Sequence, residues 1–283
     1  MMFKRNHMVE IGRMNALRVC KEVDFGVYLD GGDLGEILLP RKQVPNEINI
    51  DDILNVFIYH DSSDRLIANA LKPYAMAGEF ALLKVIDSNP VGTFFDWGLP
   101  KDLLMPFAEQ KHRMVVGNRY LVRLFLDEET SRIAASALLG EFLDPIATGF
   151  EEKQEVDLII EYPTDMGVRA IVNNQYWGML YSDEIFQPIQ CGDKLKGYIK
   201  QIRADGKLDI WLQKPGYKKI DALSQQILDY IEQHDGTIFI TDKSPPELIK
   251  KTFKTSKSSY KKAIGALYKA KLIAIENNAI RLI

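Results

Sequence analysis

The sequence predicts a multidomain, mainly β protein with an α/β tail, and three observations support this fold class. The first is an internal repeat, in which Gly12 and Gly26 return 66 residues later as Gly78 and Gly92. The second is a series of short alternating strands separated by turn residues, which is typical of small barrels. The third is a change to helical spacing after residue 216. A repeat of this length indicates copies of one small folded unit.

The first copy, residues 1–72, contains five predicted strands. They cover residues 17–19, 24–29, 35–39, 53–59 and 65–70, with a glycine-rich turn at residues 30–33. The longest connection follows the third strand and contains Pro45. Five strands in about 60 residues, with the long connection in that place, indicate a barrel of the OB type.

Two further copies follow in the same order. In the second copy, residues 73–142, the predicted strands include residues 92–97, 120–126 and 132–136. An acidic linker is predicted over residues 140–153. The third copy, residues 150–215, is more diverged, with strands predicted at residues 167–172, 177–181, 192–199 and 207–212. We therefore expect three five-stranded barrels in tandem.

Residues 217–283 predict a separate helical domain. Ile227, Leu228 and Ile231 have helical spacing, and Gly236 is expected to end that helix. Pro245 and Pro246 open a second predicted helix, and a third, capped by Ser256 or Ser258, extends to Ala270. A hairpin is predicted over residues 272–282. Three helices followed by a hairpin form a winged helix-turn-helix.

The repeats resemble S1 domains, the OB-fold modules of RNA-binding proteins. The resemblance is clearest in the first copy, at residues 25–29, 35–39, 51–52 and 61–68. Three such barrels followed by a winged helix make nearly the whole chain similar to the conserved virulence factor B family of bacterial RNA-binding regulators. The resemblance implies a non-enzymatic protein that controls gene expression through RNA.

The resemblance also implies candidate contacts. The RNA-facing aromatics of S1 domains fall on Phe25 and Tyr28, and the basic residue falls on Arg65. A histidine of the family pattern is replaced by Leu38, which removes a polar contact. In the second copy these positions are Val91, Phe94 and Arg132, and in the third they are Met166 and Arg169, with Lys207 nearby. The second and third copies therefore depart from the pattern, and one of them is expected to be a spacer or a protein contact.

Each candidate also has a structural alternative. Phe25 and Tyr28 are three residues apart, so they share a face only if Gly26 bends the strand; otherwise one ring fills the barrel. Strand alternation turns one of Phe94 and Phe95 inward. Trp97, like Tyr176 and Trp177 of the third copy, either packs against a barrel or contacts nucleic acid. Arg65 and Arg132 bind phosphate or form local ion pairs with Asp61 or Glu128.

The tail carries the strongest basic patch. Residues 217–283 contain 12 Lys and Arg against 7 Asp and Glu, a net +5, and the remainder has 24 against 32, a net −8. No acidic residue occurs between positions 250 and 271. Ile264 and Leu267 should face inward. The patch comprises Lys250, Lys251, Lys254, Lys257, Lys261, Lys262, Lys269 and Lys271, interleaved with Tyr260 and Tyr268. It favours phosphate binding over a merely solvated face.

Other functional classes find little support in the sequence. The 2 cysteines and 4 histidines are scattered, so we expect neither a metal site nor a cofactor. No apolar run approaches the length of a membrane span, and no leader segment is evident, so we expect a cytoplasmic protein that does not contact a membrane. No phosphate-binding loop or catalytic grouping is apparent, and we expect no enzymatic activity.

Three functions therefore compete. The first is binding of single-stranded RNA by the barrels, with an electrostatic contribution from the winged helix. The second is transcription control through duplex DNA, although the lysines, serines and tyrosines of the predicted third helix suit backbone contact better than base reading. The third is a protein-interaction scaffold on a ribosome or an RNA-processing assembly, which the acidic barrels favour.

Overall fold

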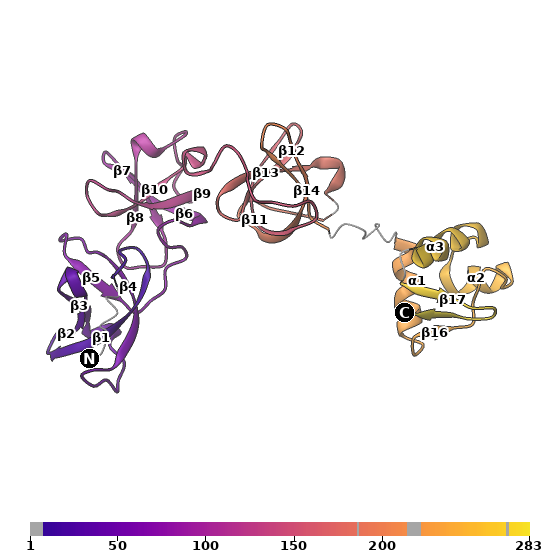
Figure 1. The fold of residues 1–283 in the computed structure, drawn as a ribbon, viewed down its shortest axis with the longest axis horizontal. Coiled ribbons are helices and arrows are strands. Elements are labelled where there is room, and N and C mark those ends of the chain that lie inside the picture. Colours follow the sequence, from indigo (N-terminus) through magenta and orange to yellow (C-terminus); the bar gives the residue numbers. More distant parts are fainter. Residues whose placement is uncertain (1–7, 186, 214–221, 270–271) are drawn as a thin grey trace. The chain divides into compact units, whose positions relative to one another are not determined.

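A computed structural model describes residues 8–185, 187–213, 222–269 and 272–283 (Figure 1). The chain divides into two compact units, Met1–Leu212 and Gln213–Ile283. Among the described residues, the first unit contains three five-stranded sheets and the second contains three helices with a small sheet. The predicted fold class is confirmed. Within the described ranges, no helix is both long and apolar enough to cross a membrane.

The first barrel is closed by the five predicted strands. They are β1 (Met14–Val23), β2 (Gly26–Asp30), β3 (Glu36–Pro40), β4 (Ile53–His60) and β5 (Leu66–Asn69), in the order β1-β2-β3-β5-β4. The β3–β5 pair is parallel, and the other pairs are antiparallel. Inward side chains such as Val27, Leu29 and Leu39 are fully buried, which accounts for the alternation seen in the sequence.

The second and third barrels repeat this order. The second comprises β6 (Phe80–Asn89), β7 (Gly92–Asp96), β8 (Leu103–Pro106), β9 (Arg119–Leu126) and β10 (Ile133–Ser136), as a sheet whose edges are β8 and β10. The third is closed and comprises β11 (Glu155–Thr164), β12 (Gly167–Val172), β13 (Tyr176–Tyr181), β14 (Lys194–Ile202) and β15 (Leu208–Trp211). Short 3-10 helices accompany the strands: η1 (Gly32–Leu34), η2 (Arg41–Gln43), η3 (Phe107–Glu109), η4 (Leu139–Phe142) and η5 (Ser182–Glu184).

The first strand of each barrel contains a bulge at the same place. The register shifts between Val19 and Lys21 in β1, between Val85 and Asp87 in β6, and between Ile160 and Pro163 in β11. Each shift places one extra residue on the first strand relative to its partner, which bends and twists the sheet toward closure. The three copies therefore share the position of this backbone irregularity as well as the order of their strands.

The three barrels of the first unit pack against one another through apolar side chains. Phe57 and Tyr59 of β4 share one core cluster with Trp97 and the interior of the second barrel. A second cluster joins Phe80 of β6 to Ile171 of β12 and includes Leu139 and Leu143. The expected linker at residues 140–153 therefore begins inside a packed junction, because the apolar side chains around η4 are buried there.

The second unit is a winged helix. It comprises α1 (Ala222–Glu232), β16 (Thr237–Ile238), α2 (Pro246–Phe253), α3 (Lys257–Lys269), β17 (Ile273–Ile275) and β18 (Ile280–Leu282). The hairpin β17–β18 was predicted, whereas β16, which pairs with β18, was not. Ser256 caps α3, since its Oγ accepts the Ser259 N–H at 3.1 Å. Ala270 and Lys271 lie outside the described residues.

Candidate nucleic-acid interface

The outer face of the first barrel carries two aromatic rings beside a lysine. Tyr28 of β2 lies opposite Lys21 of β1 and Leu38 of β3. Phe25 is 58% exposed, and its ring meets the Tyr28 ring edge-on with centroids 6.3 Å apart. The Lys21 ammonium lies 5.1 Å from the Tyr28 ring centroid. Accessible aromatic rings beside a cation suit a single strand, whose bases stack while its phosphates are attracted.

Gly26 brings these two rings onto one face. Its φ is +157°, and a Cβ at this position would lie 2.1 Å from the Leu39 carbonyl oxygen. A side chain would therefore collide with the neighbouring strand, and glycine alone allows this close approach. The chain bends between Phe25 and Tyr28 as their three-residue spacing requires, so neither ring fills the barrel.

Arg65 lies at the same barrel and is held by a local carboxylate. Its Nε and Nη2 donate to Asp61 Oδ2 at 3.0 and 2.8 Å, while the guanidinium side chain stays 72% exposed. Burial acts to raise the pKa of Asp61, but hydrogen bonds from Arg65 and from the Ser63 N–H outweigh it and hold that pKa below its ordinary value. Asp61 therefore stays ionised and positions Arg65 without enclosing it.

The face of the second barrel that corresponds to the Phe25–Tyr28 surface carries only one of the two aromatic rings. Phe94 of β7 lies opposite Leu104 of β8, whereas Phe95 is fully buried, as strand alternation requires. Val91 is exposed at the turn before β7. Phe94, Leu104 and Val91 all line a cavity of about 580 Å³ that also reaches the first barrel. This barrel therefore offers a recess where the first offers an open surface.

Trp97 is part of the junction between the first two barrels. It is only 2% exposed, and its ring centroid lies 5.6 Å from that of Phe57 and 6.0 Å from that of Tyr59. Its Nε1 donates to the Lys101 carbonyl at 2.5 Å. The ring is therefore buried on most sides, although the side chain also lines the cavity of about 580 Å³, so the expected contact with nucleic acid stays a prediction. Packing, the alternative role, is the one that its position supports.

Arg132 forms an ion pair, but not with the expected partner. Its Nε lies 2.7 Å from Oδ1 of Asp64, in the β4–β5 turn of the first barrel, rather than beside Glu128. This contact raises the pKa of Arg132 and lowers that of Asp64. The arginine side chain remains about half exposed. It therefore joins two barrels and keeps part of its guanidinium accessible.

In the third barrel, the candidate Arg169 is engaged by its own barrel. Its Nε and Nη2 donate to the two oxygens of Glu161 at 2.5 and 2.6 Å, and its guanidinium carbon lies 4.4 Å from the Trp177 ring centroid. Glu161 is 7% exposed, so removing the arginine would leave a buried carboxylate without its cation. The Arg169 side chain remains 36% exposed, so the pairing reduces its attraction for phosphates without enclosing it, and its expected contact with nucleic acid stays a prediction.

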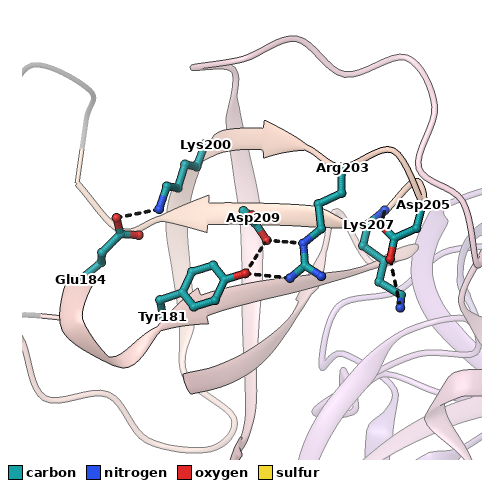
Figure 2. Close-up of polar contacts among 7 residues, drawn as sticks. All are labelled: Tyr181, Glu184, Lys200, Arg203, Asp205, Lys207 and Asp209. Atoms are coloured by element: carbon teal, nitrogen blue, oxygen red, sulfur yellow. Dashed lines mark hydrogen bonds and ion pairs between the residues drawn. The ribbon is translucent and has the colours of Figure 1, made fainter. Parts of the chain in front are cut away.

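Other cations of the third barrel are also matched by carboxylates. In Figure 2, Tyr181, Arg203 and Asp209 converge: Arg203 donates to Asp209 at 2.8 Å and to the Tyr181 hydroxyl at 2.8 Å. The same view shows Lys200 beside Glu184, 2.7 Å apart, and Lys207 beside Asp205, 3.3 Å apart. The outer surface of this barrel therefore attracts anions less than its count of basic residues indicates.

The lysines of the winged helix fall into two groups. Some contact another described residue, and others form no ion pair with one. Lys257 donates to the Ser244 carbonyl at 2.9 Å, and Lys261 lies 3.8 Å from Asp242. Lys254, Lys262 and Lys269 are exposed, and their ammonium groups form no ion pair with any described residue. Ile264 and Leu267 are buried as predicted. Tyr260 is buried too and donates to the Ile240 carbonyl at 2.7 Å, which excludes it from the patch.

Sequence reasoning missed several residues of these surfaces. The sequence did not indicate that Lys21 belongs to this surface, because the bulge that places it opposite Tyr28 is not evident in the sequence. His60, Asp64 and Lys101 lie where two barrels meet, and a pattern within one barrel does not indicate which residues border the next. Lys101 Nζ donates to the His60 and Asp61 carbonyls at 2.8 and 2.9 Å, across that boundary.

Known proteins resemble the chain over most of its length. Residues 11–70 match the S1 domain, and residues 225–282 match the CvfB-like winged helix domain. The conserved virulence factor B of Staphylococcus saprophyticus is 26% identical over 263 residues, covering 90% of this chain and 88% of that protein. The protein of the same name from Staphylococcus haemolyticus is 28% identical over 271 residues, covering 90% and 89%.

A crystal structure of a multidomain protein with nucleic acid binding domains from Streptococcus pneumoniae is also similar. It shares 23% identity, covers 96% of this chain and 98% of that one, and has a TM-score of 0.43. The S1 and winged-helix domains indicate a protein that binds nucleic acid. Their order, and the relatives that extend over both, make the chain similar to the conserved virulence factor B proteins over 90% of its length.

Proposed function

We propose that this protein binds single-stranded RNA through its barrels and regulates gene expression by that contact, without catalysing a reaction. The observation that carries the proposal is the Phe25–Tyr28 pair beside Lys21 on an open barrel face. Stacking of a base on an aromatic side chain is worth about 1–3 kcal/mol. Two adjacent rings provide enough binding energy for a weak, sequence-tolerant contact, and they need no catalytic group.

The winged helix supports the same proposal through charge. Lys254, Lys262 and Lys269 are exposed on α3 and at the end of α2. Contacts between such lysines and phosphates release counterions, so their contribution falls as salt rises. Linking a weak stacking surface to an electrostatic one in a single chain raises the overall affinity beyond that of either.

Duplex DNA is the second candidate ligand, and the exposed lysines of α3 favour it. The exposed residues of α3 are otherwise mainly Ser258, Ser259 and Tyr268. Sequence readout in the major groove most often uses the planar, bidentate side chains of Arg, Asn or Gln at base edges. The helix has no Arg, Asn or Gln. We therefore propose that any duplex contact is a contact with the backbone, secondary to RNA binding.

Fluorescence anisotropy of the full chain with labelled U-rich RNA, single-stranded DNA and duplex DNA, each at two salt concentrations, tests the proposal. We expect the tightest binding to RNA and a loss of about tenfold for Tyr28→Ala. Tyr74→Ala, which removes an exposed ring away from the Phe25–Tyr28 pair, is the matched control and should bind as the wild type does. Equal affinities of the wild type and Tyr28→Ala for RNA would refute the stacking role.

A further inference from the structure

The three barrels of the first unit meet at Gly78, just before the first strand of the second barrel. The preceding residue, Ala77, donates its N–H to the Gly12 carbonyl of the first barrel at 3.0 Å. The Gly78 N–H donates to the Leu124 carbonyl of β9 at 2.7 Å. Asn174, in the turn between β12 and β13 of the third barrel, donates from Nδ2 to the Gly78 carbonyl at 2.6 Å. A group bound beside Gly78 would therefore lie close to all three barrels.

Two guanidinium groups from different barrels face the space beside Gly78. A Cβ built on this glycine, whose φ is +86°, would lie 2.8 Å from Arg13 Nη2 and 3.7 Å from Arg123 Nη2. Apart from Gly78 and its chain neighbours, the three nearest heavy atoms all belong to these two guanidinium groups. Arg13 immediately precedes β1, and Arg123 belongs to β9. Because glycine has no side chain, the space between the two cations stays open.

The guanidinium of Arg123 lacks hydrogen-bond partners. Its Nε and Nη1 are shielded from solvent and form no hydrogen bond with any described residue. The group lies over the Phe80 ring, 4.6 Å from the centroid, and 5.7 Å from the centroid of Phe142. Burial, and next the positive charge of Arg13, lower the pKa of Arg123 below its ordinary value. An arginine still keeps its charge in such a place, so a buried cation without a partner is costly.

The carboxylate nearest to the two guanidinium groups does not balance both. Glu79 Oε1 lies 3.9 Å from Arg13 Nη1, near the limit for an ion pair, and the other oxygen, Oε2, accepts the Met76 N–H at 2.9 Å. Glu79 makes no ion pair with Arg123. The side chains of Arg13 and Glu79 are 39% and 36% exposed, so solvent reaches this place. Two cations beside one carboxylate leave a surplus of positive charge that an anion from solvent can meet.

The barrel fold does not require an arginine at this position of β9. Arg123 lies opposite Phe80 of β6. At the equivalent place in the first barrel, Phe57 of β4 lies opposite Met14 of β1, and Phe57 is fully buried in an apolar cluster. An apolar side chain therefore suits the position, and packing alone does not account for a cation there. Arginine binds phosphate strongly, because its N–H groups form charge-assisted hydrogen bonds with phosphate oxygens.

We propose that Arg13 and Arg123 hold a phosphate group beside Gly78, where the three barrels meet. The phosphate would accept a hydrogen bond from Nη2 of each arginine and supply the negative charge that Glu79 alone does not. Neither arginine lines the cavity of about 580 Å³, and neither belongs to the β2–β3 or β7–β8 face. The site is therefore separate from the candidate surfaces for bases, and it does not depend on the proposed function. A free phosphorylated molecule or the backbone of a bound strand would supply the phosphate.

Thermal melts of the full chain test the site, with inorganic phosphate titrated against chloride at constant ionic strength. The 3 tryptophans are Trp97, Trp177 and Trp211, and all of them lie in the first unit. Tryptophan fluorescence therefore follows the barrels without a signal from the winged helix. We expect phosphate to raise the melting temperature of the barrels by about 2–4 °C, because a ligand that binds only the folded state stabilises it.

Arg13→Gln and Arg123→Met should each abolish this rise. Arg13 is partly exposed, so its replacement should leave the barrels folded. Methionine at position 123 keeps apolar contact with Phe80, and replacing a buried charged group by an apolar one is often tolerated. Arg18→Gln is the matched control, because Arg18 is an arginine of the first barrel that already has two carboxylate partners. This variant should retain the rise, and melts in chloride alone confirm that each variant is folded.

Anisotropy with labelled U-rich RNA identifies the source of the phosphate. If the slope of log affinity against log salt is shallower by about one contact in each arginine variant, the strand supplies it. If the slopes match the wild type but the phosphate-induced rise is lost, a free phosphorylated molecule occupies the site. The inference is overturned if both variants match the wild type in slope and in their response to phosphate. A wild type that binds no RNA would refute the proposed function, and the melts would still test the phosphate site.

Discussion

Arg132, immediately before β10, and Asp64, in the β4–β5 turn, form an ion pair across the boundary of two barrels. Their Nη2 and Oδ2 atoms are 2.5 Å apart, although 68 residues separate them in the chain. Arg132 lines the cavity of about 580 Å³, and so does Trp97, whose ring also contacts Phe57 and Tyr59. Polar and apolar contacts together therefore fix how the second barrel meets the first.

Asp64→Asn should remove the ion pair of Arg132 and leave the arginine guanidinium available to a phosphate. Because both side chains are about half exposed, we expect only a small change in the melting temperature. The freed guanidinium should make the slope of log affinity for RNA against log salt steeper, by the contribution of about one phosphate contact. Anisotropy at three salt concentrations measures this slope. Asp33→Asn removes the same charge from an exposed position in η1 and should leave the slope unchanged; equal slopes for the two variants would contradict the prediction.

Trp97→Ala should weaken the junction of the first two barrels. The side chain is 2% exposed, and truncating a buried tryptophan costs about 3–5 kcal/mol through lost burial and the cavity left behind. Urea unfolding followed by circular dichroism measures the loss. We also expect a broadened or two-step transition, since the ring contributes to packing on both sides. An unchanged single transition would show that the barrels do not depend on this contact, and Phe107→Ala serves as the exposed control.

Tyr260→Phe should alter the pH dependence of the winged-helix domain. Burial raises the pKa of Tyr260 above its ordinary value of 10.0, with the charge of Asp242 as a smaller cause. The folded state therefore keeps the proton that the unfolded state releases, so this contribution to stability is complete below about pH 10 and declines as the pH rises further. The phenylalanine variant should lack that decline.

Urea unfolding of both proteins at several values between about pH 8 and pH 11 checks the difference. Near neutral pH, Tyr260→Phe should lose about 1 kcal/mol, because the hydrogen bond to the Ile240 carbonyl is removed. Comparing the two proteins cancels the titration of every other tyrosine and lysine. Parallel curves across the alkaline range would show that Tyr260 does not retain its proton on folding.

Neutralising Lys262 and Lys269 together should weaken only the electrostatic, salt-dependent part of nucleic-acid binding. Both are exposed on α3 without an ion pair to described residues, so Lys→Gln changes should leave thermal stability unaffected. The slope of log affinity against log salt should fall by about two contacts for duplex DNA. A double variant of Lys200 and Lys207, which lie beside carboxylates, is the matched control. A loss of affinity that does not vary with salt would contradict a phosphate-contact role.

The regular parts of this fold could be predicted from the sequence because their signals are local. Alternation within strands and the 66-residue repeat located the barrels, and the spacing of Ile264 and Leu267 located the inner side of α3. Gly26 between two aromatics indicated the bend that the structure contains. By contrast, β16 spans only Thr237–Ile238 and depends on pairing with β18, so no local pattern indicated it.

The candidate site was predictable only where one barrel forms it alone. Phe25, Tyr28 and Arg65 lie on one barrel, where Phe25 and Arg65 are exposed and Tyr28 is half-buried. The environments of Trp97, Arg132 and His60 are set by the neighbouring barrel. Their contacts depend on the docking of separately folded units, which leaves no periodic signal in the chain. The ion pair of Arg169 was not predicted for a related reason, since its partner Glu161 lies in the bulge of β11.

The shared core of the first two barrels has a consequence for how affinity depends on oligonucleotide length. Because Phe57 and Tyr59 belong to the same cluster as the interior of the second barrel, the two candidate binding faces are held at a fixed separation. A strand too short to span that separation engages one face only. A strand just long enough gains the second contact at a high effective concentration, without the entropic penalty of closing a flexible loop. Affinity should therefore rise abruptly at one threshold length and change little on either side of it.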